Sequence, residues 1–466
     1  MKKYVSFIIL ACMILSMALS LTSCDFVNRI IAGFNPPVIA GVKLSEYVIV
    51  YDEDGLDYNR RAAEYIKTRA YEELGVKIDI VDDSAAASAH EIVVGETSRA
   101  ISGELDADTK GVEFAILAKG GSIALEGDYF VIAAAACFFM ETYAPTSGYE
   151  ATMPEGVMVH QPIQKEAKNF IMLIGDGMGV YQTKLFEYME NNCEYGDGED
   201  LFYGYMLPYR GYSRTESLSG VTDSAAGGTA LACGYKTLNE YIGRDKDQND
   251  IKSLTELASE KGMAGAVMST ETKTGATPSS FSAHADSRNS TSDILASQAE
   301  SITKYGTIVD CGYDYYSAKY MEVIENHIED TLGQISSNKN GFFIMYEEAH
   351  IDKHCHKNDI NNTYLALIRF NQAIARFMEF AFYNPDTLVL ITADHETGML
   401  LPGEDGVLAY NDDDHSAADV PVFAWGQGAE LFNGKTIENI QIAHTVAALM
   451  GEDNFGDQSK YKSLTK

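Results

Sequence analysis

Three segments of the chain follow one plan, in which an apolar run ends abruptly in acidic residues and histidines. Residues 170–174 lead into Asp176, residues 342–345 into Glu347, Asp352 and His356, and residues 388–391 into Asp394 and His395. Carboxylate oxygens together with imidazole nitrogens suit zinc, and a neighbouring site richer in oxygen suits magnesium. The pattern therefore predicts a metal centre.

Taken singly, each of these motifs has an ordinary explanation. An aspartate followed by glycine is usually a turn, and an Asp-His pair is often a cap. Asp352 and His356 lie four residues apart, as neighbours on one polar helix face do. The carboxyl ends of parallel strands, however, meet at one edge of a sheet, where ligands of α/β proteins bind. Three apolar strands that end in this way are expected to deliver their side chains to the same edge.

A fourth segment, residues 221–230, offers a candidate nucleophile. Ser224 follows an aspartate and precedes a run of small residues that permits a tightly packed helix. A serine in the first turn of such a helix would face the backbone amides and the positive dipole end, which attract phosphate. An ordinary helix cap is the alternative interpretation, because Ser and Asp are favoured at caps.

Together these motifs resemble the alkaline phosphatase family. Residues 221–229 match the family signature in which the serine after the aspartate attacks phosphorus. The other family blocks appear in the family's order: Ile174 to Gly179, Ala276 to Pro278, Ser287-Arg288, Glu347 to His356, Thr392 to His395, and His415. The resemblance implies an α/β fold with a mostly parallel sheet sandwiched by helices. It also implies hydrolysis of phosphate monoesters through a phosphoserine on Ser224.

The resemblance implies a site for two zinc ions and one magnesium ion. The first zinc would be held by Asp352, His356 and His415, and the second by Asp176, Asp394, His395 and Ser224. The magnesium would share Asp176 and add Thr277 and Glu347. In this family pattern the zinc ions favour the serine alkoxide and stabilise the leaving group.

The resemblance also implies which residues contact the phosphate. Arg288 would clamp two phosphoryl oxygens, with Asp223 as its partner. Lys353 matches relatives with lysine at this position, where contact with phosphate through water and a solvated surface lysine are both open. Many relatives carry Asp or His where this chain has Gly275, so an outer group of the magnesium site is expected to be missing. We therefore expect Gly275→Asp to tighten magnesium binding.

Other functions fit the sequence less well. The sequence lacks the Cys-x-Pro-x-Arg pattern of sulfatases. A phosphodiesterase of the same superfamily stays open, although the Arg288 clamp fits the terminal phosphate of a monoester better. An inactive surface binding protein is disfavoured because the set of candidate ligands is complete.

The elements that must position these residues are those of an α/β protein. From residue 164 to residue 466, apolar strands alternate with amphipathic helices, which predicts a mostly parallel sheet. The chain has 466 residues and is 46% apolar, more than one compact core usually holds. A second folded unit is therefore expected before residue 164.

Residues 41–163 are predicted to form this second, α+β unit. Strands are expected at 48–51 and 92–94, a helix with Ala62, Ile66, Ala70 and Leu74 on one face and Gly75 as its stop, a hairpin of 114–117 with 123–125, and a helix at 129–143. The sequence shows no acid, base or metal cluster in this unit, so an accessory role is expected. The unit resembles the non-catalytic α+β domain placed before many bacterial glycosidases.

The first 24 residues have the features of an export signal. Two lysines precede an apolar run from Tyr4 to Leu21, and the following Thr22-Ser23-Cys24 completes a match that resembles a bacterial lipobox. The resemblance implies a signal peptide at 1–24, a linker at 25–40, and a lipidated Cys24 that anchors an exported protein to the bacterial cell membrane, facing outward.

Charge and cysteine content limit the partners. A formal charge of −33 argues against nucleic acid as a partner, whereas a small phosphate ester needs only a local positive site. Two of the seven cysteines belong to the signal, and the five that remain cannot all pair within one chain. The sequence leaves the oligomeric state open, a homodimer included.

Overall fold

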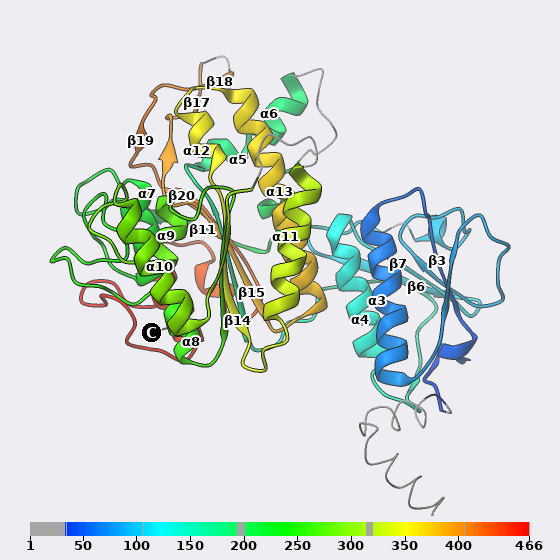
Figure 1. Ribbon diagram of the computed structural model, residues 1–466. Coiled ribbons are helices and arrows are strands. Elements are labelled where there is room, and N and C mark those ends of the chain that lie inside the picture. The colour runs from blue at the N-terminus through cyan, green and yellow to red at the C-terminus, as the bar shows by residue number, and fades with distance from the viewer. Residues whose placement is uncertain are drawn as a thin grey trace, which may run out of the picture. The chain divides into compact units, whose positions relative to one another are not determined.

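The computed structural model describes residues 33, 35–105, 107–192, 201–313, 320–404 and 406–465. The predictions for Cys24 and the signal peptide lie outside these residues. The chain forms two compact units, which meet in sequence between Ile163 and Gln164 (Figure 1). No helix in the described part of the chain is both long enough and apolar enough to cross a membrane.

The first unit is built on a six-stranded sheet of order β4-β3-β5-β7-β6-β9. Its strands are β3 Val48–Tyr51, β4 Asp79–Asp82, β5 Glu91–Val94, β6 Phe114–Lys119, β7 Ser122–Glu126 and β9 Gly156–His160. The helices α3 (Asp57–Leu74) and α4 (Ile132–Tyr143) pack together on one face of this sheet. Three short strands, β1 Val38–Ile39, β2 Val42–Lys43 and β8 Glu150–Ala151, pair separately.

The elements expected in this unit are confirmed. The apolar face of α3 is buried, and the helix ends where Gly75 adopts a left-handed φ of 66°. Sequence reasoning found no acidic cluster here, but Asp52, Asp82 and Asp83 come together. Because these side chains are partly exposed and accept hydrogen bonds from backbone amides of nearby loops, they have an ordinary structural role.

The second unit contains an eight-stranded sheet of order β13-β12-β14-β10-β15-β20-β11-β21. The strands are β10 Asn169–Gly175, β11 Tyr209–Arg214, β12 Ala264–Ser269, β13 Ile308–Cys311, β14 Phe342–Glu348, β15 Thr387–Thr392, β20 Val420–Trp425 and β21 Thr436–Glu438. The five strands from β13 to β15 in this order run parallel, and β20 is antiparallel to both its neighbours. The predicted mostly parallel sheet is therefore present.

Helices cover both faces of this sheet (Figure 1). They are α5 Val180–Thr183, α6 Leu185–Asn192, α7 Ser224–Cys233, α8 Leu254–Glu260, α9 Ala276–Ser282, α10 Thr291–Tyr305, α11 Tyr320–Ile335, α12 His350–Cys355, α13 Ile360–Tyr383 and α14 Asn439–Leu449. In Figure 1, α7 to α10 lie along one face and α11 and α13 along the other. The α/β sandwich predicted from the sequence is confirmed.

The strands that precede the candidate ligands are fully buried. Every residue of β10, β14 and β15 lies in the interior, as expected for a parallel sheet covered on both faces. These strands are adjacent, with β12 beyond β14, and their carboxyl ends therefore open onto one edge. That edge carries the candidate site.

Candidate active site

The turn after β10 places Asp176 against the neighbouring strand. Asp176 N donates a hydrogen bond to Glu348 O at 3.1 Å, and Gly177 follows with a φ of 72°. A Cβ atom at Gly177 would lie 2.9 Å from Asp352 Cα and 2.9 Å from Thr397 Oγ1. Only glycine permits this close approach, which brings the turns after β10, β14 and β15 together.

A pair of two-residue strands brings His415 into the site. In this small antiparallel ladder β16 (Glu396–Thr397) pairs with β19 (His415–Ser416), so that Thr397 lies opposite His415. The ladder extends the chain after Asp394 and His395 and returns a distant segment to the same edge of the sheet. The rings of His395 and His415 stack, with centroids 3.6 Å apart.

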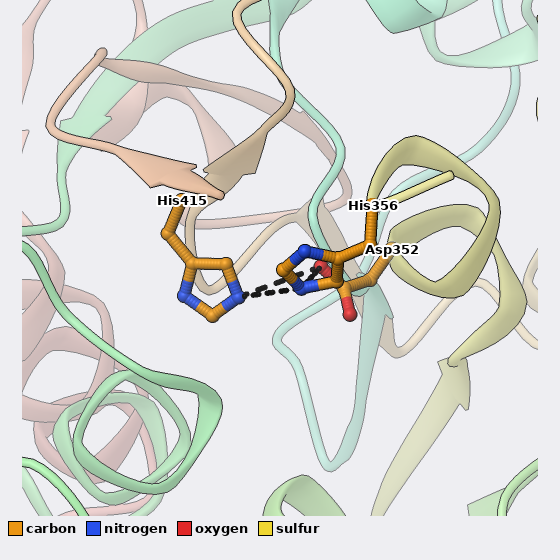
Figure 2. Close-up of side chains that lie close together, drawn as sticks. All are labelled: Asp352, His356 and His415. Atoms are coloured by element: carbon orange, nitrogen blue, oxygen red, sulfur yellow. Dashed lines mark hydrogen bonds and ion pairs between the residues drawn. The ribbon is translucent and has the colours of Figure 1, made fainter. Parts of the chain in front are cut away.

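Asp352, His356 and His415 form one compact group (Figure 2). His356 Nε2 and His415 Nε2 face each other at 3.2 Å. Asp352 Oδ1 lies 3.3 Å from the first nitrogen and 3.6 Å from the second. The sequence proposed these three residues as one ligand set, and the structure brings them together.

The hydrogen bonds of the two Nδ1 atoms determine which nitrogen of each ring carries the proton. His356 Nδ1 lies 2.6 Å from Asp413 O and His415 Nδ1 lies 2.8 Å from Thr222 O. A carbonyl oxygen only accepts hydrogen bonds, so each Nδ1 carries the proton. In the neutral rings both Nε2 atoms then present lone pairs to each other and to a carboxylate. A cation between them fits this donor set, and backbone acceptors behind histidine rings are typical of metal sites.

A second group surrounds the deeply buried His395. Its Nε2 lies 3.4 Å from Asp176 Oδ1, 3.3 Å from Asp394 Oδ2 and 3.2 Å from Ser224 Oγ. Both carboxylate oxygens are buried and have no hydrogen-bond partner among the described residues. Uncompensated buried carboxylates are costly, so these oxygens also fit metal coordination.

Thr397 links the two groups. Its hydroxyl donates to Asp352 Oδ1 at 2.6 Å and lies 3.2 Å from His395 Nδ1. The Thr397 hydroxyl has one proton, which it donates to Asp352. His395 Nδ1 must therefore donate to the hydroxyl oxygen. This leaves His395 Nε2 unprotonated and directed at Ser224 and the two carboxylates.

Burial and crowding of like charges shift the acid and base equilibria of this region. Burial and the carboxylates of Asp394 and Asp352 raise the pKa of Asp176 well above its usual range. Burial and the charge of Asp352 raise the pKa of Asp394 to about 6. Burial and the neighbouring His415 lower the pKa of His395 well below its usual range. A bound cation would relieve the carboxylate repulsion and hold these groups ionised.

The candidate magnesium ligands lie on the β12 side of Asp176. Glu347 is buried near the end of β14, where the Ser269 hydroxyl donates to its Oε2. Thr277 is buried in the first turn of α9, and its hydroxyl faces Glu347. Burial and the charges of Glu271 and Asp394 raise the pKa of Glu347 to about 8, although both hydroxyls act in the opposite direction.

Ser224 begins α7, and Asp223 caps this helix. The Asp223 side chain accepts a hydrogen bond from Ala226 N at 2.9 Å, so the predicted cap and the predicted nucleophile are adjacent features of one helix start. Ser224 is only 4% exposed and directs its hydroxyl toward His395. The serine therefore faces both the candidate ligands and the amides of the first helical turn.

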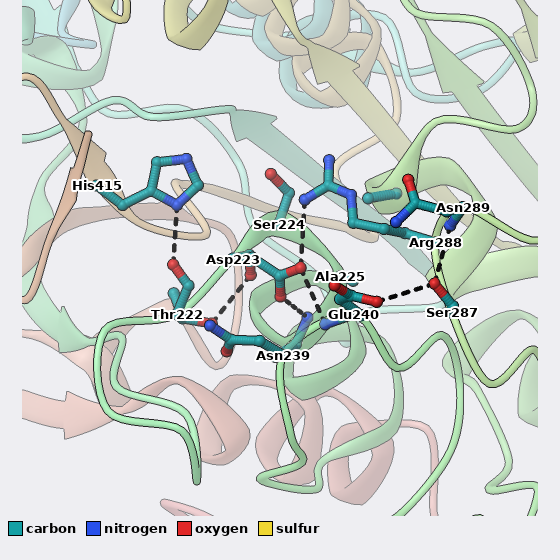
Figure 3. A network of polar contacts seen from close by, with 12 residues as sticks. Thr222, Asp223, Ser224, Ala225, Asn239, Glu240, Ser287, Arg288, Asn289 and His415 are labelled. Carbon is teal, nitrogen blue, oxygen red and sulfur yellow. Dashed lines mark hydrogen bonds and ion pairs between the residues drawn. The ribbon is translucent and has the colours of Figure 1, made fainter. Parts of the chain in front are cut away.

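Arg288 lies beside Ser224 and is oriented by two acidic residues (Figure 3). Its Nη1 donates to Asp223 Oδ2 at 3.3 Å, and its backbone N donates to Glu240 O at 2.7 Å. Glu240 N in turn donates to Asp223 Oδ2 at 3.0 Å. Glu240 has a φ of 75°, a backbone conformation that residues other than glycine rarely adopt, so this loop holds a strained residue next to Arg288.

Lys353 lies near the candidate magnesium ligands and pairs with an acidic residue. Its Nζ donates to Glu271 Oε1 at 2.8 Å, and the lysine side chain is 38% exposed. Burial lowers its pKa, but Glu271, Asp176 and Glu347 outweigh that effect and raise it. Lys353 is therefore a fixed, charged group at the rim of the site.

Sequence reasoning missed three contributors to this site. Thr397 and Glu240 act through contacts whose partners lie far away in sequence, and Glu271 lies in a loop with no motif of its own. Thr397 has a local partner as well, because its hydroxyl also contacts His395, two residues before it. The other two need the three-dimensional contacts to be found.

Comparison with known proteins finds similar sequences and structures for the second unit. The family model described as alkaline phosphatase matches residues 167–324 and 317–411, more than half of the chain. Alkaline phosphatase 3 of Bacillus subtilis (strain 168) is 30% identical over 297 residues, which are 52% of this chain and 64% of that protein. The match thus spans less than two thirds of this relative's length.

Solved structures share the fold. Alkaline phosphatase from the Antarctic bacterium TAB5 matches with a TM-score of 0.53 and 27% identity, covering 62% of this chain and 99% of that one. A variant of the TAB5 enzyme, solved with Mg bound in its M3 site, matches with a TM-score of 0.52 and 26% identity, covering 62% and 100% of the two chains.

Proposed function

Because this chain belongs to the alkaline phosphatase family, we propose that it hydrolyses phosphate monoesters through a phosphoserine intermediate on Ser224. The main support is that Ser224 Oγ lies 3.2 Å from the unprotonated Nε2 of His395, which also faces two carboxylate oxygens, Asp176 Oδ1 and Asp394 Oδ2, that have no hydrogen-bond partner among the described residues. A serine hydroxyl is a weak nucleophile unless its surroundings favour the ionised form.

The binding of phosphate is assigned to groups around Ser224. The Arg288 guanidinium has five N–H donors in a fixed fork, and Asp223 orients it through one of them. The remaining donors fit two oxygens of a terminal phosphoryl group. The first turn of α7 adds its amides and its positive dipole end. Lys353 adds a second positive charge at the rim, which fits contact through water.

We assign the metal positions as the sequence resemblance implied. Asp352, His356 and His415 would hold one zinc ion, and Asp176, Asp394, His395 and Ser224 the other. Asp176, Thr277 and Glu347 would hold magnesium. When bound, such ions act as Lewis acids that neutralise charge on phosphoryl oxygens and favour the ionised form of a hydroxyl. Two observations support this assignment: the Nε2 atoms of His356 and His415 face each other, and Asp176 Oδ1 and Asp394 Oδ2 have no hydrogen-bond partner among the described residues.

Turnover of matched esters tests the proposed activity. The protein should hydrolyse aryl and alkyl phosphate monoesters, with aryl sulfates left intact and diesters turned over less efficiently. Chelation should abolish the activity, and zinc with magnesium should restore it. A kcat/KM for a diester equal to or above that for the monoester would replace the monoesterase assignment with the phosphodiesterase one. Absence of hydrolysis by the fully metallated protein would leave a binding function.

We also propose that the protein is exported and held at the outer face of the bacterial membrane by a lipid on Cys24. The basic start, the apolar run and the Cys24 motif support this proposal. Cys24→Ser should release the protein from the membrane fraction, because the variant cannot carry the proposed lipid. Continued detergent-dependent extraction of the variant would point to another anchor.

A further inference from the structure

Gly275 has no conformational reason to be a glycine. Its φ of −57° and ψ of 154° are accessible to any residue. A Cβ atom built there, however, would lie 2.5 Å from Glu271 Cγ and 3.0 Å from Glu271 Cδ. The space beside position 275 is therefore filled by the Glu271 side chain. A side chain added at position 275, as in Gly275→Asp, would therefore have to displace the Glu271 side chain.

Hydrogen bonds tie Glu271 to the candidate magnesium ligands. Its backbone N donates to Ser269 Oγ at 2.9 Å, and the same hydroxyl donates to Glu347 Oε2. At its other end, Glu271 Oε1 accepts the Lys353 ammonium at 2.8 Å. Glu271 thus connects the end of β12 with Glu347 on β14 and with Lys353 on α12.

The Glu271 carboxylate also acts electrostatically on the ligands. After burial, its charge is among the causes that raise the pKa values of both Glu347 and Asp176. The Lys353 ammonium, which Glu271 holds, is influenced by the same two carboxylates. Glu271 therefore contributes negative charge to the place where a hard cation would bind, and Lys353 offsets part of that charge.

We propose that Glu271 is a positioning residue for the candidate magnesium site, where its side chain fills the space beside Gly275 and its carboxylate holds Lys353 next to the ligands. This proposal rests on the proposed function. It explains why an acidic residue and a glycine occur together in the segment 271–275: a side chain at position 275 would exclude the Glu271 carboxylate. The ion concerned is a hard divalent cation such as magnesium, which prefers oxygen donors.

Magnesium titration of the full-length, zinc-loaded protein tests this role. Isothermal titration calorimetry should give a magnesium dissociation constant that rises by about tenfold or more in E271Q, since loss of an outer group that orients ligands commonly has this effect. E271Q keeps the shape of the side chain and removes only its charge. Metal analysis should show two zinc ions in both proteins, which separates this effect from general damage.

Two double variants distinguish the proposed role of Glu271 from a purely structural effect. In E271A/G275D the new carboxylate enters the vacated space, and magnesium affinity should return toward that of the wild type. In E271A/G275A the same space is filled without charge, and affinity should stay low. Unchanged magnesium affinity in E271Q, or equal affinities in the two double variants, would overturn the proposal.

The results that would rule out the role of Glu271 differ from those that would rule out the proposed function. If the wild-type protein binds no magnesium and hydrolyses no monoester, the proposed function fails. If the wild type does both and E271Q binds magnesium equally well, only the role of Glu271 is lost.

Discussion

At the scale of single residues, the candidate site is defined by acceptors that lie behind the histidine rings. Backbone carbonyls accept from His356 and His415, and the Thr397 hydroxyl accepts from His395. Each contact fixes one ring nitrogen as a donor and leaves the other as a lone pair facing the carboxylates. The rings are therefore already oriented for metal binding.

Glu347 gives a test of the metal-free protein at this scale. Its pKa is about 8 in the folded chain, against an ordinary value of 4.5. Because the folded form binds this proton more tightly, the protonated carboxyl stabilises the fold at low pH, and that contribution is lost as pH rises to 8. We expect the Tm of the metal-free protein to fall as the pH rises from about 6.5, where ordinary histidines are half protonated, to 8.

The matched variant is Glu347→Gln, which cannot ionise. Calorimetry of the metal-free variant should show a flatter dependence of Tm on pH over the same range. Equal slopes for both proteins would mean that Glu347 is not the group responsible. Addition of metal to the wild-type protein should remove the slope, since a cation holds the carboxylate ionised.

Residue identities could be predicted where they lie in recognisable blocks, such as Asp394-His395 directly after a strand. Residues that only position the candidate ligands could not be predicted, because they act through partners that are distant in sequence. Glu271 shows this most clearly: sequence alone identified the unusual Gly275 but interpreted it as a loss. The contact between the two positions gives the physical reason for the glycine.

At the scale of elements, α7 positions Ser224, the proposed nucleophile, by packing closely against the sheet edge and α9. A Cβ atom at Gly227 would lie 3.0 Å from Asp394 O and 3.1 Å from Asp394 Cβ, and one at Gly228 would lie 3.1 Å from Ser280 Oγ. The run of small residues after Ser224 thus has a packing function, as the sequence predicted.

Gly227→Ala should disturb both packing and chemistry. The added methyl group must push α7 from the turn that carries Asp394, so we expect a loss of about 1–3 kcal/mol in the free energy of unfolding. The same shift should lower kcat by separating Ser224 from its neighbours. Urea unfolding and steady-state kinetics measure the two effects.

Gly333→Ala in α11 is the control, because a Cβ atom there meets nothing within 4 Å. Replacing this helical glycine should leave kcat unchanged and stabilise the fold by about 0.5–1 kcal/mol. If Gly227→Ala behaved like this control, close packing of α7 would not be what positions Ser224.

The main strands were predictable because parallel strands buried on both faces read as continuous apolar runs. The two-residue ladder of β16 and β19 was not, since strands this short have no periodicity. The position of His415 could therefore come only from family resemblance or from the structure.

At the scale of the whole molecule, a chain of charge −33 is proposed to act on an anionic substrate. The negative net charge does not prevent binding of an anion, because one sheet edge carries groups that supply positive potential. These groups are Arg288, Lys353, the start of α7 and the proposed metal ions. All candidate ligands lie in the second unit, from Asp176 to His415.

The second unit should therefore work without the first. A chain that starts at Gln164 is expected to bind the same metals and to retain kcat and KM for small monoesters, because each unit has its own sheet and core. Metal analysis and steady-state kinetics check this expectation. A raised KM at matched metal content would show that the first unit contributes to the pocket, and loss of kcat would contradict its accessory role.

Covalent catalysis by Ser224 is the central step of the proposed function, and trapping the intermediate tests it directly. The fully metallated protein is mixed with an aryl phosphate monoester, quenched in acid, digested and analysed by mass spectrometry, with Ser224→Ala as the control. We predict one phosphoryl group on Ser224 in the wild-type protein and none in the variant, which should also lose turnover. Turnover with no phosphate on Ser224, or undiminished turnover by Ser224→Ala, would contradict covalent catalysis by this serine.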